Sequence, residues 1–411
     1  MNGGSPWLAA DEACALLDVK KQTLYAYVSR GLIRSSPDPA APRKRLYSRP
    51  DVDRVRRRSA ARSGHQAVAA GALQFGQPVL DSELTAIAER GHAYRGQSAI
   101  RLAETSTFEA AAELLFEGAL PAEATTWVGS TLGLPRTAVK ALRTEAVLDR
   151  LSGVVPLLAA RDSARQSPDL GKARLLIRRL AGALALSPVG PLPEDAMAEE
   201  RIAAILLRAL GVSPNPTKLR AVDRALILCA DHELNPSSFS ARVTAAAGGD
   251  IYASVASALA TLSGPRHGGA TDRVEALVEE VGAPERALSV LSGRVRRGEP
   301  ITGFSHPLYP RGDPRAVSLL GEAQRIGGRL RAVRCTAAVV EAAEVLGVGR
   351  PTVDVGLVSL RHALRLPESG GAALFAVGRS AGWIAHAREQ RAAGFLLRPR
   401  ARYVGPPIDD G

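Results

Sequence analysis

From Pro78 onward the chain alternates amphipathic helical windows with short breaks rich in proline and glycine. Segments such as STFEAAAELLF and KARLLIRRLAGALAL place apolar residues three or four positions apart, which is the spacing of one helix face, and SPVGPLP is typical of the breaks. No stretch shows a sustained alternation of period two. Alanine, leucine and arginine, all good helix formers, are abundant, whereas aromatic residues are only 4%. The sequence therefore predicts a mainly α-helical protein.

The first part of the chain has a pattern of its own. At 411 residues, the chain exceeds what one hydrophobic core usually organises, so more than one domain is expected. WLAADEACALLDV and KKQTLYAYVSRGLI each predict a helix, and Gly31 is expected to end the second. A proline-rich turn, a basic strand around Arg45 to Tyr47 and the start of a third helix at Pro50 follow. These signals predict a small domain over 1–59, followed by a linker over 60–75.

This order of elements resembles the winged helix-turn-helix domains of the MerR and excisionase type. The resemblance implies that the second helix enters the DNA major groove and that the basic strand contacts phosphates. Residues 1–65 hold 13 Lys and Arg against 6 Asp and Glu, which is more than half of the excess behind the chain's net charge of +12. The candidate DNA-binding residues are Gln22, Thr23, Tyr25, Arg43, Lys44 and Arg45. The alternative is a degenerate module that now serves docking or dimerisation.

Cysteine usage and hydropathy narrow the classes of protein. Cys14, Cys229 and Cys335 are far apart and form no CxxC pair, so neither a disulfide framework nor a thiolate metal site is indicated. No apolar run reaches the roughly 18 residues that a membrane helix needs, and the start lacks the basic and apolar regions of a signal peptide. We therefore expect a cytoplasmic protein without a membrane partner.

Three of the seven histidines lie in stretches punctuated by glycine and proline, namely ADHELNPSSFSAR, LSGPRHGGA and ITGFSHPLYPRGDPR. Such stretches fall at helix ends or loops, where a side chain can reach a ligand. Taken singly, each histidine is better explained as a capping or core residue than as a ligand-binding one. HELN lacks the second histidine one turn on that a zinc-binding helix supplies, so no metal site is predicted.

Together with PTVDVG and FAVGRSAGWIAHAREQ, these stretches resemble the citrate synthase family in their order and approximate spacing. VLDSELTAIAERGHAYRGQSAIRLAETSTFEAAAELLFEGALP resembles the N-terminal segment of that family, so the similarity spans about 75–405. The resemblance implies a homodimer with a two-domain helical fold, in which a small domain of 269–375 closes over a large domain of 76–268 and 376–411. It also implies condensation of acetyl-CoA with oxaloacetate to citrate and coenzyme A (CoA), with no bound cofactor.

The resemblance assigns roles to individual residues. Asp354 matches the base that removes a methyl proton from acetyl-CoA, His267 the donor to the thioester oxygen, and His306 the group that polarises the ketone of oxaloacetate. Guanidinium groups pair bidentately with carboxylates, so arginines are expected around oxaloacetate. The substrate-binding candidates are His232, Arg315, Arg379 and Arg398. Arg398 is expected to reach the active site of the neighbouring subunit, and Arg311 is the candidate for binding CoA.

Several functions remain open on the sequence. A 2-methylcitrate synthase would use propionyl-CoA at the same site, and the two thioesters differ by one methylene. A citryl-CoA lyase would run the carbon bond cleavage. A transcription regulator would use the synthase-like part to sense citrate, oxaloacetate or acyl-CoA. Retention of His267, His306 and Asp354 favours catalysis, because a sensor has no need of a general base.

Overall fold

The computed structural model describes residues 7–17, 19–38, 41–53, 55, 80–88, 90–143, 146–167, 169–187, 190–401 and 403–406, and only the backbone of 41–43. The chain divides after residue 81 into two compact units. The predicted linker, 60–75, lies outside the described residues. Within the described ranges, no helix is both long and apolar enough to cross a membrane.

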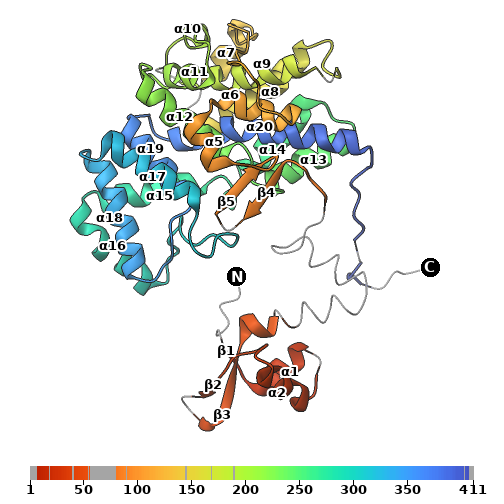
Figure 1. Cartoon of the computed structure of the whole chain (residues 1–411), viewed down its shortest axis with the longest axis vertical. Helices are drawn as coiled ribbons and strands as arrows, with labels where there is room; N and C mark the ends of the chain where they lie inside the picture. Colours follow the sequence, from red (N-terminus) through yellow and green to blue (C-terminus); the bar gives the residue numbers. More distant parts are fainter. Residues whose placement is uncertain are drawn as a thin grey trace. The chain divides into compact units, whose positions relative to one another are not determined.

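The N-terminal unit contains helices packed on a small antiparallel sheet (Figure 1). Its elements are β1 (Trp7–Leu8), α1 (Ala10–Leu17), α2 (Lys21–Ser29), β2 (Ser35–Asp38) and β3 (Ala41–Ser48), and the strand order is β1-β3-β2. Both predicted helices and the predicted basic strand are present, and 49–53 are helical where a third helix was expected. The core of this unit consists of Leu8, Ala13, Leu17, Leu24, Ile33, Tyr47, Val52 and Val55. It is thus separate from the core of the second unit.

The second unit begins with a three-stranded antiparallel sheet that the sequence patterns did not predict. Its strands are β4 (Thr85–Ala88), β5 (Gly91–Tyr94) and β6 (Gln97–Ser98), in that order across the sheet. Strands of two to four residues are too short to show a clear alternation of period two. The connecting turns depend on Gly91, Arg95 and Gly96, which all have positive φ angles.

The rest of the unit is helical, as predicted. The helices before residue 250 are α5 (Ala99–Thr105), α6 (Phe108–Glu117), α7 (Arg136–Ala141), α8 (Val147–Arg161), α9 (Leu170–Ala183), α10 (Pro193–Met197), α11 (Ile202–Ala209), α12 (Pro216–Cys229) and α13 (Pro236–Ala246). Those after it are α14 (Ile251–Leu262), α15 (Ala270–Val281), the 3-10 turn Pro284–Arg286, α16 (Ala287–Arg297), α17 (Pro314–Gly327), α18 (Arg331–Val345), α19 (Val353–Leu364) and α20 (Gly370–Ala393).

The helix α20 is the centre of this unit (Figure 1). It is 24 residues long, and most of its side chains are buried on all sides. The larger apolar cluster of the unit surrounds it. A smaller cluster lies among α15, α16, α18 and α19, and its central members are Val274, Leu277, Leu291, Val339 and Val358. The helix α19 contributes to both clusters and so connects them.

Two glycines of α20 allow it to approach the end of α12 closely. A Cβ atom at Gly378 would lie 2.7 Å from the carbonyl oxygen of Leu226, and one at Gly382 would lie closer still to that of Ala230. The amide of Gly382 donates a hydrogen bond to the Ala230 carbonyl at 2.9 Å. Any side chain at these positions would push the two helices apart. The contact brings the intervening Arg379 against the end of α12.

We expect Gly382→Ala to lower the free energy of unfolding by about 2 kcal/mol, because the added methyl group overlaps backbone atoms that cannot move independently. Gly321→Ala is the matched control. Gly321 lies within α17, and a methyl group added there would meet no atom within 4 Å, so alanine should raise the stability by about 0.5–1 kcal/mol. Chemical denaturation followed by circular dichroism measures both, and a Gly382→Ala protein as stable as the wild type would refute the close approach.

Candidate active site

The three histidine-bearing stretches lie at helix ends, as the sequence predicts. His232 lies between α12 and α13, His267 between α14 and α15, and His306 in the loop before α17. Local capping explains two of these breaks. Asn235 and Asp313 accept hydrogen bonds from the first amides of α13 and α17, and a proline follows each.

The rings of His232, His306 and Tyr309 form the centre of the site. Nε2 of His232 lies 2.9 Å from the hydroxyl of Tyr309. The ring centroids of His232 and His306 are 5.3 Å apart, and those of His306 and Tyr309 are 5.1 Å apart. A fourth ring, that of His92 from β5, packs 5.6 Å from His232. The site therefore combines the small sheet, the end of α12 and the loop before α17.

Asp231 fixes the position of the neighbouring His232. Its buried carboxylate accepts a hydrogen bond from the hydroxyl of Thr85 and lies 3.2 Å from Nε2 of His386 on α20. Its amide donates to the hydroxyl of Tyr94 at 3.1 Å. Burial alone would raise the pKa of Asp231, but the interaction with His386, the charge of Arg379 and the hydrogen bond from Thr85 hold it below the usual value. The backbone before His232 is thus anchored to both the sheet and α20.

The environment of His306 determines which of its nitrogens carries a proton. The amide of Leu308 donates to Nδ1 of His306 at 3.1 Å. Since an amide can only donate, Nδ1 is unprotonated and the hydrogen of the ring is on Nε2. Burial, together with the charge of Arg315, lowers the pKa of His306 and favours this neutral form. His306 therefore presents an Nε2–H donor.

His267 is held by Ser237. Its Nε2 lies 2.9 Å from Oγ of Ser237, and the indole of Trp383 donates to the same oxygen at 3.0 Å. Oδ1 of Asn235 also lies 2.7 Å from this oxygen, so the single hydroxyl hydrogen of Ser237 goes either to Asn235 or to His267. Burial, with a smaller effect from Arg379, lowers the pKa of His267 to about 4. His267 is therefore neutral at pH 7.

Asp354 lies in the first turn of α19, where two threonines hold its carboxylate. The hydroxyl of Thr271 donates to Oδ1 at 2.8 Å, and that of Thr352 donates to Oδ2 at 3.1 Å. Thr271 belongs to α15 and Thr352 precedes α19. The carboxylate is therefore oriented by two separate elements, and each oxygen keeps a lone pair for a further partner.

Arg315 is paired within the protein. Its Nε and Nη2 contact the carboxylate of Asp313 at 2.9 and 2.8 Å, and both side chains are buried. Asp313 also accepts from the amide of Val353 at 3.0 Å. This carboxylate thereby ties the start of α17 to the start of α19, which carries Asp354. The guanidinium of Arg315 lies 5.6 Å from the ring centre of Tyr309.

Arg379 forms no ion pair with a carboxylate in the described part of the chain. The residue is 2% exposed, and its Nε donates to the carbonyl of Cys229 at 2.6 Å. Its guanidinium lies 4.6 Å from the ring centre of Phe375. Neither terminal nitrogen is hydrogen-bonded to a described residue. Burial lowers the pKa of Arg379, and its charge in turn lowers the pKa of His232 beyond the effect of burial and of Arg315. The charge of the nearby Asp231 offsets part of this burial, but no described carboxylate is hydrogen-bonded to the guanidinium, so an anionic ligand would stabilise it further.

Most of the remaining candidates are exposed. Arg398 is exposed in the segment that follows α20, and Arg311 is exposed in the loop before α17. In the N-terminal unit, Gln22, Tyr25, Lys44 and Arg45 are exposed and Thr23 is partly buried. The side chain of Arg43 lies outside the described residues.

Sequence reasoning missed several residues that complete the site. They are His92, Ser237, Thr271, Thr352, Tyr309, Asp313 and Trp383. Tyr309 and Asp313 stand in the same stretch as His306, and the Asp-Pro pair is a helix-start signal that locates Asp313. The others come from separate elements, and no local pattern identifies them.

A comparison with protein families identifies the chain. Residues 73–400 match the model described as citrate synthase, C-terminal domain. The chain belongs to the citrate synthase family. Among curated proteins, citrate synthase 2 of Bacillus subtilis is 36% identical over 224 residues, which is 54% of this chain and 59% of that protein. The chain spans little more than half the length of this relative and of several other curated ones. A 2-methylcitrate synthase of Shewanella oneidensis is 29% identical over 82% of this chain and 95% of its own length.

Solved structures agree with this family. The citrate synthase of Thermotoga maritima is 27% identical, with a TM-score of 0.69 over 82% of this chain and 96% of its own. The citrate synthase of Thermoplasma acidophilum, in a ternary complex with carboxymethyl coenzyme A and oxaloacetate, has a TM-score of 0.72 over 83% of this chain and 97% of its own. At 24% identity, this second structure supports the fold alone. The predicted helical architecture is thereby confirmed for the second unit.

We expect acidification to destabilise the protein through its buried histidines. A histidine in an unfolded chain has a pKa of about 6.5, whereas burial lowers the pKa of His92 to about 3 and that of His267 to about 4. Below about pH 6.5 the unfolded chain therefore binds protons that the folded protein does not, and the free energy of unfolding falls as the pH falls.

The variant His92→Leu isolates one of these groups, because all other titrating residues are common to both proteins. Between about pH 7 and about pH 5, the variant should lose about 2 kcal/mol less stability than the wild type. Urea denaturation at the two pH values measures the difference. Equal losses in both proteins would contradict a neutral, buried His92.

Proposed function

We propose that this chain is a citrate synthase, which condenses acetyl-CoA with oxaloacetate and water to give citrate and CoA. The observation that carries the proposal is the unpaired, buried guanidinium of Arg379 beside His232. Burying this charge is unfavourable and the nearby Asp231 offsets only part of that cost, so a substrate carboxylate bound to the guanidinium would be favourable. Oxaloacetate has two carboxylates and a ketone, and the neighbouring groups match all three.

In this proposal Arg379 and Arg315 bind the carboxylates of oxaloacetate. Arg315 shares its guanidinium with Asp313, and its Nη1 makes no hydrogen bond to a described residue. His232 adds a hydrogen bond. Nε2–H of His306 donates to the ketone oxygen, which makes the carbonyl carbon more electrophilic and supplies a proton to the alkoxide that forms.

The proposed site for acetyl-CoA uses Asp354 and His267. Asp354 takes a proton from the methyl group, and Thr271 and Thr352 hold its carboxylate for that transfer. His267 stabilises the charge that develops on the thioester oxygen. It can do so when the hydroxyl of Ser237 donates to its Nε2, because the neutral ring then carries its hydrogen on Nδ1.

We further propose the domain arrangement of 76–268 with 376–411 as the large domain and 269–375 as the small one. The separate apolar cluster among α15, α16, α18 and α19 supports this division. His306 and Asp354 then belong to the small domain, and His232 and Arg379 to the large one. Closure after oxaloacetate binds would assemble the reacting groups and exclude water.

Two assignments extend beyond one subunit and one substrate. We propose a homodimer in which Arg398 of the partner subunit completes the oxaloacetate pocket, since Arg398 is exposed after the end of α20. Arg311 is proposed to contact CoA.

Propionyl-CoA, and hence 2-methylcitrate synthase activity, is the near alternative, because a relative of that name aligns over most of this chain. The three cysteines are free, which fits the reducing cytoplasm that we propose as the location.

The first test is the release of CoA thiol from acetyl-CoA, and in parallel from propionyl-CoA, by the purified protein. Release should depend on oxaloacetate, and the thioester with the higher kcat/KM is the preferred substrate. Folded protein that binds oxaloacetate but releases no thiol would overturn the proposal in favour of a ligand-sensing regulator. Formation of acetyl-CoA from citryl-CoA, without condensation, would point to the lyase.

Matched variants separate the two halves of the site. Asp354→Asn should lower kcat by at least about 100-fold, while oxaloacetate still raises the melting temperature, because the base acts on the other substrate. Arg379→Ala should instead raise the KM for oxaloacetate steeply and abolish the thermal shift. Normal turnover of the first variant, or normal oxaloacetate affinity of the second, would refute the corresponding role.

We also propose that the N-terminal unit is a winged helix-turn-helix domain that binds DNA. The antiparallel pair of β2 and β3 follows α2 and carries Lys44 and Arg45 on its exposed surface. On α2, Gln22 is exposed and Tyr25 is 52% exposed. A large exposed aromatic residue near the basic Lys21 suits contact with a nucleic acid. A docking or dimerisation module is the alternative.

The prediction for this unit is a complex with duplex DNA that weakens as salt rises. Replacing Arg43, Lys44 and Arg45 by alanine should weaken binding and reduce the slope of log affinity against log salt by roughly 1 per lost phosphate contact. The control replaces Arg286, Arg296 and Arg297, which lie in the second unit, and should retain the slope. The absence of a mobility shift at low salt would refute DNA binding. An equal loss of DNA affinity in both triple variants would refute a specific role of β3.

A further inference from the structure

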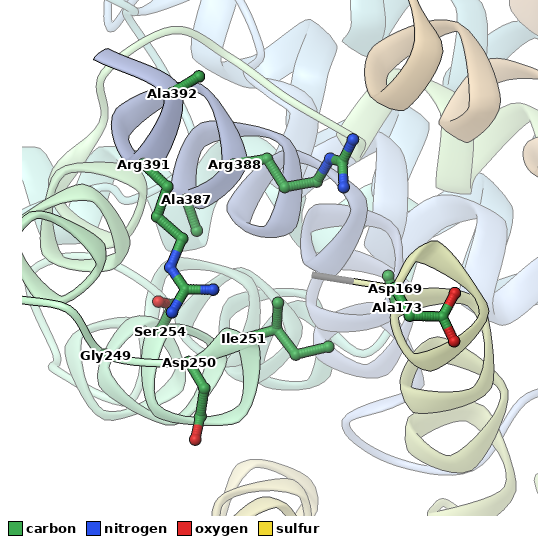
Figure 2. A pocket seen from close by; sticks show the side chains of 10 residues that line it. All are labelled: Asp169, Ala173, Gly249, Asp250, Ile251, Ser254, Ala387, Arg388, Arg391 and Ala392. Carbon is green, nitrogen blue, oxygen red and sulfur yellow. The ribbon is translucent and has the colours of Figure 1, made fainter. Parts of the chain in front are cut away.

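A cavity of about 320 Å³ lies away from the histidine site, where α9 and α14 begin and α20 ends (Figure 2). None of the residues assigned above to the candidate active site lines it. From the groups on its wall we infer that it is a second binding site, for a small organic anion that joins a carboxylate or phosphate group to a short apolar body. This inference does not depend on the proposed reaction.

The first observation is the hydroxyl of Ser254. The side chain is 1% exposed and lines the cavity, yet its Oγ has no hydrogen-bond partner among the described residues. Thr244 and Thr261, on α13 and α14, each donate to the carbonyl four residues earlier, as is usual for helical hydroxyls. Ser254 makes no such bond. A buried hydroxyl without a partner costs about 1–3 kcal/mol, so this group calls for a partner from outside the chain.

The second observation is a pair of arginines on one face of α20. Arg388 and Arg391 are three residues apart and both line the cavity, and the side chain of Arg391 reaches toward Ser254 and Asp250 (Figure 2). Arg391 is only loosely held, since its Nη2 lies 3.5 Å from both Oε1 of Gln166 and the carbonyl of Gly248, the limit for a hydrogen bond. A ligand oxygen at the usual distance would bind it better than either of these groups.

The acidic residues of the wall are already used. Asp169 accepts from the amide of Gly171 at 2.8 Å and caps α9. Asp250 accepts from the amide of Ala253 at 2.8 Å and caps α14, and its other oxygen pairs with Arg165 at 3.3 Å. These two carboxylates offset the positive ends of α9 and α14 and the charge of Arg165. The positive charge of Arg391 is therefore left for an anion.

The rest of the wall is apolar and limits the size of the ligand. Ile251, Ala173 and Ala387 are buried and line the cavity. The volume is at the lower end of the range for small-molecule sites. A ligand that fits this cavity has one anionic group, which contacts Arg391 and Ser254, and a few carbon atoms, which pack against the apolar wall.

The test is a thermal-shift titration of the full chain with sodium butyrate and with sodium phosphate, each against sodium chloride at equal ionic strength. Butyrate or phosphate should raise the melting temperature saturably, which chloride should not. The more effective of the two names the anionic group. If neither butyrate nor phosphate raises the melting temperature more than chloride does, the inference is overturned.

Variants locate the response. Arg391→Gln should weaken binding about tenfold, and Ser254→Ala should weaken it several-fold without lowering the melting temperature of the anion-free protein, because it removes an unpaired buried hydroxyl. Arg296→Gln, on the surface of α16, is the control and should bind as the wild type does. Arg379→Ala should keep the response. A response lost in Arg379→Ala but retained in Arg391→Gln would assign the anion to the histidine site and refute the second site.

Discussion

The contact between α20 and the end of α12 supports the candidate site. Gly378 and Gly382 let the two backbones meet, and the amide of Gly382 donates to the Ala230 carbonyl. The same contact places the Arg379 guanidinium at the Cys229 carbonyl. Two helix turns beyond Arg379, His386 reaches the carboxylate of Asp231, the residue before His232. The close packing of α20 on α12 therefore positions both the Arg379 guanidinium and the backbone that carries His232.

Burial has two opposite effects in this site. It keeps His92, His267 and His306 neutral, so that each ring has one nitrogen that donates a hydrogen bond and one that accepts. It also makes the unpaired charge of Arg379 costly until an anion arrives. Arg315 avoids this cost through Asp313, which at the same time joins α17 to α19. The site is thus prepared for a negatively charged ligand before one binds.

The sequence predicted much of the fold because helix starts are local. The glycines and prolines of the three histidine stretches predicted helix ends or loops there, and the structure has helix ends at all three. The sheet containing His92 escaped prediction because its strands are too short to show a period. The motifs supplied His267, His306 and Asp354 as candidates, but not the threonines, serine and tyrosine that orient them.

The sequence by itself determined that the chain is helical, where its helices are interrupted, and that histidines stand at three of those interruptions. These features depend on neighbours within a few residues, through capping, proline geometry and side-chain periodicity. Only the tertiary structure decided which helix ends meet, that Arg379 is buried without a carboxylate partner, and that Ser254 faces a cavity beside Arg391. Those features depend on contacts between residues more than a hundred positions apart, which no local pattern records.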